Sequence, residues 1–210
     1  MTYSIDAKPL WQPNPNSVGD TQMAIFMQAM GHGRYSDLWQ WSVDQPEAFW
    51  SKLWDFCGVV GEKGSEILVD RNKMPGARWF PQSRLNYAEN LLKNREEGEA
   101  LVFWGEDKVK RRLSRSELHA EVARFQQFLL AAGVGEGDRV AGFLPNLPET
   151  LVAMLATVAL GAIWSSASPD FGVQGVLDRF GQIEPKVLVC VDGYWYNGKQ
   201  AGCLAKNAEI

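Results

Sequence analysis

The sequence has few histidines and cysteines, the residues most typical of zinc centres and of activated nucleophiles. It contains two histidines, and neither has a nucleophile at a recognisable spacing. Its three cysteines are far apart and odd in number, a pattern that fits neither a disulfide framework nor a zinc site. We therefore expect no metal site and no catalytic residue in this chain. Cys57 and Cys190 have apolar neighbours and are interpreted as small buried residues of a protein in a reducing compartment.

Positive charge and long apolar runs are also lacking. The chain has 21 lysines and arginines against 25 acidic residues, a net charge of -4, which argues against a nucleic-acid partner. No apolar run reaches membrane-spanning length, and the N-terminus lacks the pattern of a signal peptide. These absences predict a soluble, cytoplasmic protein with no membrane or nucleic-acid partner.

The most informative part of the chain is a strand, helix and strand pattern over residues 137–169. A short apolar strand is expected at 139–144, a helix that is apolar on nearly every face at 149–160, and a second strand at 163–166. A helical crossover of this length makes the two strands parallel. A further amphipathic helix at 173–183 and a strand at 186–191 extend the alternation. The fold class is therefore α/β, with a doubly wound, mainly parallel sheet covered by helices on both faces.

A helical segment and a hairpin are expected before this sheet. Asp20, Asp44 and Ser83 are interpreted as the N-caps of helices, and the first of these helices carries an apolar stripe that should be buried. Residues 59–82 are expected to be irregular, and residues 100–113 to form a β-hairpin. Ser114 and Glu117 have the spacing of a capping box at the start of the next helix.

Two local patterns could suggest ligand binding but have simpler interpretations. Gly133, Gly135 and Gly137 precede a strand instead of joining a strand to a helix, so they indicate a turn and not a phosphate loop. A local basic strip on the hairpin favours a solvated edge over an anion site; it consists of Lys108, Lys110, Arg111, Arg112 and Arg115.

Three stretches carry a resemblance to a known family. They are GARWFPQSRLNYAENLL at 76–92, GDRVAGFLPNLPETLVAMLATVALGAIWSSASPDFG at 137–172 and VDGYWYNGK at 191–199. Together they resemble the N-terminal part of acetoacetyl-CoA synthetases, which belong to the acyl-adenylate-forming superfamily close to the acetyl-CoA synthetases. Acetyl-CoA synthetases usually have a Gly-Gly pair where this chain has Pro169 and Asp170, and this difference favours the acetoacetate branch.

The resemblance implies a two-step ligase reaction with ATP, Mg²⁺ and CoA, in which an acyl-adenylate forms and the CoA thiol then displaces AMP. It also implies that residues 1–98 are a helical N-terminal domain and residues 99–210 the first part of an AMP-binding domain. The sequence lacks the family's phosphate loop, its adenine and ribose motifs, and its C-terminal catalytic lysine. We therefore expect an N-terminal fragment that is inactive alone and that self-associates through exposed apolar surface.

The resemblance further implies contacts with the CoA nucleotide. The matching positions are Asp170 and Phe171 after the second inner strand, Lys199 after the third, and Arg179 on the helix between them. Lys199 replaces an arginine of the acetyl-CoA relatives, which keeps the charge but loses bidentate phosphate geometry. The alternatives are that Lys199 is a loop lysine and that Arg179 pairs with Asp178 or Glu184.

Two other functions stay open. The acid could be another short-chain acid such as acetate or propionate, because the acid pocket of the family lies in later segments. The chain could also be a stand-alone, non-catalytic interaction module. A stop codon directly after Ile210 in the native gene would favour the module, and continuation into a Gly/Thr-rich loop would exclude it.

Overall fold

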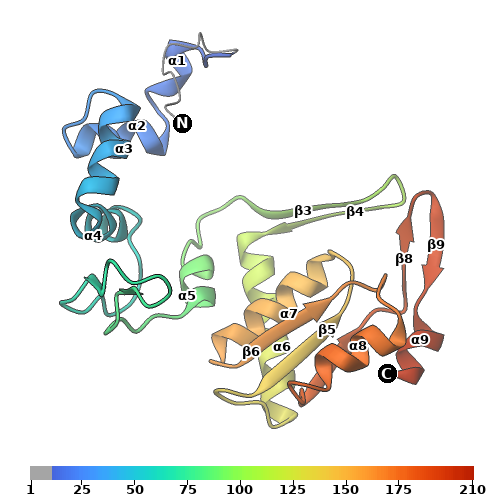
Figure 1. Ribbon diagram of the computed structural model, residues 1–210. Coiled ribbons are helices and arrows are strands. Elements are labelled where there is room, and N and C mark those ends of the chain that lie inside the picture. The colour runs from blue at the N-terminus through green and yellow to red at the C-terminus, as the bar shows by residue number, and fades with distance from the viewer. Residues whose placement is uncertain (1–10) are drawn as a thin grey trace, which may run out of the picture. The chain divides into compact units, whose positions relative to one another are not determined.

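The first part of the chain combines short helices with irregular segments, and the second part has a mixed α/β arrangement. The computed structural model describes residues 11–210 (Figure 1). The chain divides into two units, Met1–Arg84 and Leu85–Ile210, and each is described by itself. Over residues 11–84 the first unit contains four helices and a short antiparallel strand pair: α1 (Pro15–Val18), α2 (Gln22–Ala29), α3 (Tyr35–Asp44), α4 (Pro46–Phe56), β1 (Leu68–Val69) and β2 (Arg78–Trp79).

Aromatic contacts hold the helices of the first unit together. The ring of Phe26 on α2 lies 5.9 Å from the ring of Phe49 and 4.9 Å from that of Phe56, both on α4. Phe26 is the buried residue of its helix, whereas Met23 and Ile25 are 54% and 42% exposed. The predicted buried stripe on α2 is therefore wrong, because this short helix packs along a narrow face.

The N-caps of α2 and α4 each lie one residue after the predicted ones. Thr21 caps α2, with its hydroxyl accepting the N–H of Ala24, so Asp20 is not the cap. Asp44 is the last residue of α3, and Gln45 stands before α4. Because Pro46 is the first residue of α4, the residue directly before it is forced out of the helical region.

The second unit is built around a three-stranded parallel sheet. The sheet has the order β6-β5-β7, and β5 is parallel to both neighbours. Two antiparallel hairpins, β3–β4 and β8–β9, accompany it. The elements are α5 (Tyr87–Leu92), β3 (Glu99–Gly105), β4 (Val109–Ser114), α6 (Arg115–Ala131), β5 (Arg139–Phe143), α7 (Pro148–Ala159), β6 (Ile163–Ala167), α8 (Val173–Phe180), β7 (Val187–Cys190), β8 (Gly193–Tyr196), β9 (Lys199–Gly202) and α9 (Leu204–Glu209).

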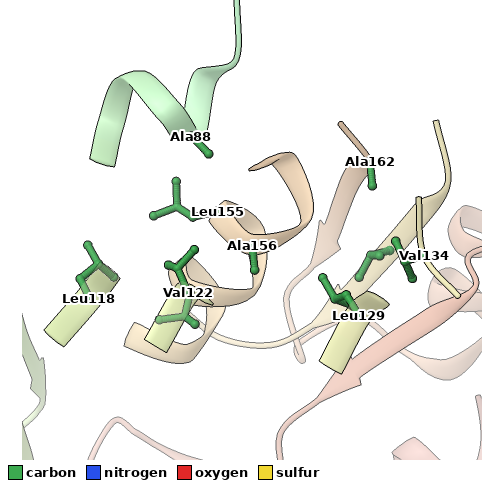
Figure 2. Packing of buried hydrophobic residues seen from close by; sticks show 10 residues of the cluster. Ala88, Leu118, Val122, Leu129, Val134, Leu155, Ala156 and Ala162 are labelled. Carbon is green, nitrogen blue, oxygen red and sulfur yellow. The ribbon is translucent and has the colours of Figure 1, made fainter. Parts of the chain in front are cut away.

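The two faces of the sheet are covered by different helices. Figure 2 shows the first core, in which Leu155 and Ala156 of α7 lie next to side chains of α6, and Ala88 of α5 lies beside Leu155. Val140 of β5 belongs to this core, whereas the next residue, Ala141, packs on the opposite face with Val176 and other side chains of α8. The alternation along β5 confirms the doubly wound α/β sheet that the sequence predicts.

Local sequence signals explain the ends of several elements in this unit. The capping box at the start of α6 is confirmed, with the Ser114 hydroxyl accepting the Glu117 N–H at 3.2 Å. Asn86, and not Ser83, caps α5, and its side-chain amide also donates to the Val158 carbonyl of α7 at 2.8 Å. That second bond attaches the short helix α5 to the sheet unit.

The glycine pattern and the cysteines have different outcomes. The glycines after α6 form a turn, as predicted, in which the Gly135 N–H donates to the Asp138 carboxylate at 2.8 Å. Cys57 and Cys190 are exposed and Cys203 is buried, so the prediction that the first two are buried is wrong. Cys190 is the last residue of β7, an edge strand, where apolar sequence neighbours do not ensure burial.

Among the described helices, none is both long and apolar enough to cross a membrane.

Candidate functional site

The candidate site lies where the parallel strands end. In doubly wound sheets, ligands bind outside the carboxyl ends of the strands, because the loops there converge. Here the loop after β6, residues 168–172, leads into α8, and the chain after β7 enters the hairpin β8–β9. Both segments carry residues that the sequence selects as CoA contacts.

The loop 168–172 is a tight turn with its own hydrogen bonds. The Ser168 hydroxyl donates to the Asp170 carboxylate at 2.9 Å, and the Phe171 N–H donates to the Ser168 carbonyl at 3.1 Å. Pro169, between them, is fully buried, and Gly172 is the N-cap of α8. The turn therefore has one face fixed against the protein and one face open to solvent.

Asp170 is joined to the hairpin β8–β9. Its second carboxylate oxygen accepts the hydroxyl of Tyr194 at 2.9 Å. Partial burial of the phenol raises the pKa of Tyr194 above its ordinary value, and the hydrogen bond to the Asp170 carboxylate raises this pKa further. Tyr194 is therefore neutral, and a donor, throughout the physiological pH range.

Phe171 and Arg179 contact each other. The Arg179 guanidinium lies 4.2 Å from the centre of the Phe171 ring, and it donates to the Gly175 carbonyl at 2.8 Å. Within the described residues it makes an ion pair with neither Asp178 nor Glu184, so that alternative interpretation of Arg179 is wrong. The Arg179 guanidinium therefore lies at the loop 168–172, and its other N–H groups are able to donate hydrogen bonds to an anion.

Lys199 stands apart from these three residues. It is the first residue of β9, is exposed, and pairs in register with Tyr196 across the hairpin. The hairpin turn is Asn197-Gly198, with φ of 50° and 73°, the conformation that favours these two residue types. The structure brings Asp170, Phe171 and Arg179 together, and it places Lys199 on the hairpin that Tyr194 joins to them.

Sequence reasoning missed two residues of this region. Tyr194 is the first, and Lys206 of α9 is the second: its ammonium donates to the carbonyls of Pro169 and Phe171 at 2.7 and 3.3 Å. The pair Asn197-Gly198, directly after the run of aromatic residues 194–196, is a usable signal for the hairpin. No local pattern indicates that Lys206 reaches back to the loop, because 35 or more residues separate the partners.

The basic strip of the β3–β4 hairpin is engaged within the protein. Arg111 contacts the carboxylates of Glu121 and Glu149, and Arg112 contacts Glu99 at 2.5 Å. The Lys110 ammonium lies over the Trp104 ring, 4.6 Å from its centre. These contacts engage three of the five residues of the strip within the protein.

Two hollows flank the candidate site. One, of about 830 Å³, is lined by α6, α7 and β7; the other, of about 620 Å³, lies between the hairpins β3–β4 and β8–β9 and is rich in aromatic side chains. No group of three or more His, Cys, Asp or Glu residues in the part of the chain that the structure describes could hold a metal ion. Arg179 at the loop and Lys199 on the hairpin are exposed cationic groups of this region.

Known proteins resemble this chain over almost its whole length. It is 54% identical over 199 residues to the acetoacetyl-coenzyme A synthetase of Rhizobium meliloti (strain 1021), covering 92% of this chain and 31% of that protein. The acetoacetyl-CoA synthetase of Xenopus tropicalis is 42% identical, with 98% and 32% covered. The structure of an acetoacetyl-CoA synthetase from Streptomyces lividans matches 97% of this chain and 33% of that one, with a TM-score of 0.87 and 41% identity. The chain thus spans about a third of the length of the relatives it matches.

Two family models match successive parts of the chain. Residues 35–91 match the acetyl-coenzyme A synthetase N-terminus, and residues 88–209 match the AMP-binding enzyme model. The second match covers more than half of the sequence and includes the sheet and the candidate site. The chain therefore belongs to the AMP-binding enzyme family.

Proposed function

We propose that this chain is part of an acetoacetate–CoA ligase, which converts acetoacetate, ATP and CoA to acetoacetyl-CoA, AMP and pyrophosphate. The observation that carries the proposal is the 54% identity over 199 residues to an acetoacetyl-CoA synthetase. The similarity to the Streptomyces lividans structure, at 41% identity, supports it.

The part of the reaction that we assign to this chain is CoA binding. Arg179 at the loop 168–172 and Lys199 on the hairpin would pair with phosphates of the CoA nucleotide, and the exposed ring of Phe171 offers an apolar surface beside them. ATP and Mg²⁺ are required by the family, and we assign neither their binding nor a catalytic residue to this chain. We keep 1–98 and 99–210 as the proposed limits of the N-terminal and AMP-binding domains.

Another short-chain acid is the second candidate. A malonamoyl-CoA synthetase, vrtB of Penicillium aethiopicum, is 37% identical over 204 residues, so relatives of this chain act on different acids. We favour acetoacetate because the acetoacetyl-CoA synthetases named above match at higher identity.

The test begins with the native gene. The gene should be read past the codon for Ile210, and its whole product assayed for AMP release with ATP, CoA and Mg²⁺. We expect release with acetoacetate to exceed that with acetate, propionate or malonamate. Preference for another acid would support the second candidate, and a stop codon after Ile210 with no acid-dependent AMP release would overturn both ligase proposals in favour of a non-catalytic module.

We also propose a cytoplasmic location, with no nucleic-acid or membrane partner.

We further propose that the 210-residue chain by itself self-associates. The large hollow beside the edge strand β7, about 830 Å³ and lined partly by Phe125, Phe128 and Leu144, supports self-association through apolar surface. Sedimentation should show dimers or larger species that bind a hydrophobic dye. A sharp monomer boundary without dye binding would overturn this proposal.

A further inference from the structure

The loop 168–172 is held from three different elements. Tyr194 of β8 donates to the Asp170 side chain, Lys206 of α9 donates to the carbonyls on either side of it, and Arg179 of α8 covers Phe171. Three attachments on five residues fix the conformation of a segment that lies open at the end of the sheet. Such preorganisation lowers the entropic cost of binding a ligand there.

Asp170 does not suit the role of a phosphate contact. Each of its two carboxylate oxygens accepts a hydroxyl of the protein, one from Ser168 and one from Tyr194, both at 2.9 Å. A carboxylate also repels the phosphates that the neighbouring cations attract. Its hydrogen bonds are directed inward, toward the loop itself and toward the hairpin.

The hairpin register connects this bond to Lys199. Tyr194 pairs with Ala201 and Tyr196 pairs with Lys199. Residues directly opposite each other, and residues two apart on one strand, lie on the same face of a hairpin. Lys199 therefore lies on the face that carries Tyr194, about 7 Å along the strand direction. Because β8 and β9 are paired, the hydrogen bond that holds Tyr194 also restrains β9, the strand that carries Lys199.

We propose that Tyr194 and Asp170 are positioning residues, whose hydrogen bond joins the loop 168–172 to the hairpin β8–β9 and so holds Arg179 and Lys199 at the spacing that the CoA nucleotide requires. For the identity of the ligand, this rests on the proposed function. It gives Asp170 a role different from the direct CoA contact that the family resemblance implies.

The test uses Tyr194→Phe, which removes one hydroxyl, with Tyr196→Phe as the matched control. Tyr196 is on the same strand, is 67% exposed, and makes no hydrogen bond among the side chains that the structure describes. In the whole product of the native gene, the KM for CoA in thioester formation should rise about tenfold in Tyr194→Phe, as for a lost hydrogen bond to a charged acceptor. Acetoacetate-dependent exchange of pyrophosphate into ATP, which needs no CoA, should stay as in the control.

A mutant cycle separates positioning from ligand contact. Asp170→Ala should raise the KM for CoA as much as Tyr194→Phe, and the double variant should be no worse than either single variant. Asp170→Asn keeps an oxygen that accepts the tyrosine hydroxyl, so it should recover most of the affinity that Asp170→Ala loses. Additive losses, or a Tyr194→Phe protein that matches the Tyr196→Phe control, would overturn the proposal.

Failure of the proposed function would look different. An unsubstituted protein without exchange in the presence of acetoacetate or any other short-chain acid tested would overturn the ligase assignment and leave the positioning role to a binding measurement. Titration calorimetry with CoA then compares Tyr194→Phe with Tyr196→Phe. Tenfold weaker binding in the first variant alone supports the positioning role, and equal binding, or no CoA binding by the unsubstituted protein, overturns it.

Discussion

Gly142→Ala is the sharpest single test of how the sheet is packed. Gly142 lies in the central strand β5, and a Cβ atom there would come within 2.5 Å of two carbons of the Trp164 ring on the neighbouring strand β6. Ordinary contacts between carbon atoms are about 3.5–4.0 Å. The ring therefore has to move by roughly 1 Å or more, although it packs against the larger core.

The size of the effect follows from two opposing terms. Overpacking of this kind costs about 1–3 kcal/mol. Replacing glycine by alanine in an ordinary strand conformation returns about 0.4–1 kcal/mol, because the unfolded chain loses freedom. We expect the free energy of unfolding of the sheet unit to fall by about 1–2 kcal/mol, which makes its amides exchange hydrogen about 5 to 30 times faster.

Hydrogen exchange measured by mass spectrometry on peptides covering β5 is the assay, because it reports this unit separately. Gly202→Ala is the control, since a Cβ at Gly202 meets nothing within 4 Å. In a Trp164→Leu background the cost of Gly142→Ala should largely disappear. Exchange as slow as in the unsubstituted protein, or an unchanged cost in the Trp164→Leu background, would refute the packing argument.

Two further predictions concern the core and the acid range. Leu155→Ala, in the fully buried centre of α7, should lower the free energy of unfolding by about 2–5 kcal/mol in urea titrations. Leu177→Ala, at a 39% exposed position, should lower it far less. Similar losses at both positions would contradict the core assignment. The hydrogen bond from Lys186 lowers the pKa of Asp138 most, and the hydrogen bond from the Gly135 N–H lowers it further. The ionised Asp138 therefore stabilises the folded state above the pKa of an unfolded aspartate, and this stabilisation is lost as the pH falls through the lower pKa of the folded state. Asp138→Asn should therefore be less stable than the unsubstituted chain at pH 7 and about equally stable at pH 2, and a stability difference that persists in acid would rule this out.

The regular elements of the sheet could be predicted from the sequence because their signals are local. The apolar run that forms α7 lies between two strand-forming segments, and a crossover of this kind leaves parallel pairing as the favoured arrangement. The capping box at Ser114 involves residues three apart, so its geometry follows from the sequence pattern alone. Both predictions are confirmed.

The predicted helix caps were wrong where several candidates stand together. Asp20 and Thr21 are both good capping residues, so residue type alone does not decide which of them caps α2. Asp44 is a good capping residue by type. The steric effect of Pro46 on the residue before it was the stronger constraint, and it places the break at Gln45.

The candidate site could be located from the sequence only in part, since its side chains are arranged by tertiary contacts. The family resemblance implies the loop after β6, which contains Asp170 and Phe171, and this loop lies at the carboxyl end of a parallel strand, where ligands of such sheets bind. The partner of Asp170 is Tyr194, 24 residues away, and no periodicity connects the two. A sequence pattern can select a loop, but the hydrogen bonds of the folded chain decide which of its side chains remain available to a ligand. By that criterion the carboxylate of Asp170 is occupied within the protein, whereas the side chains of Arg179 and Lys199 are exposed cations.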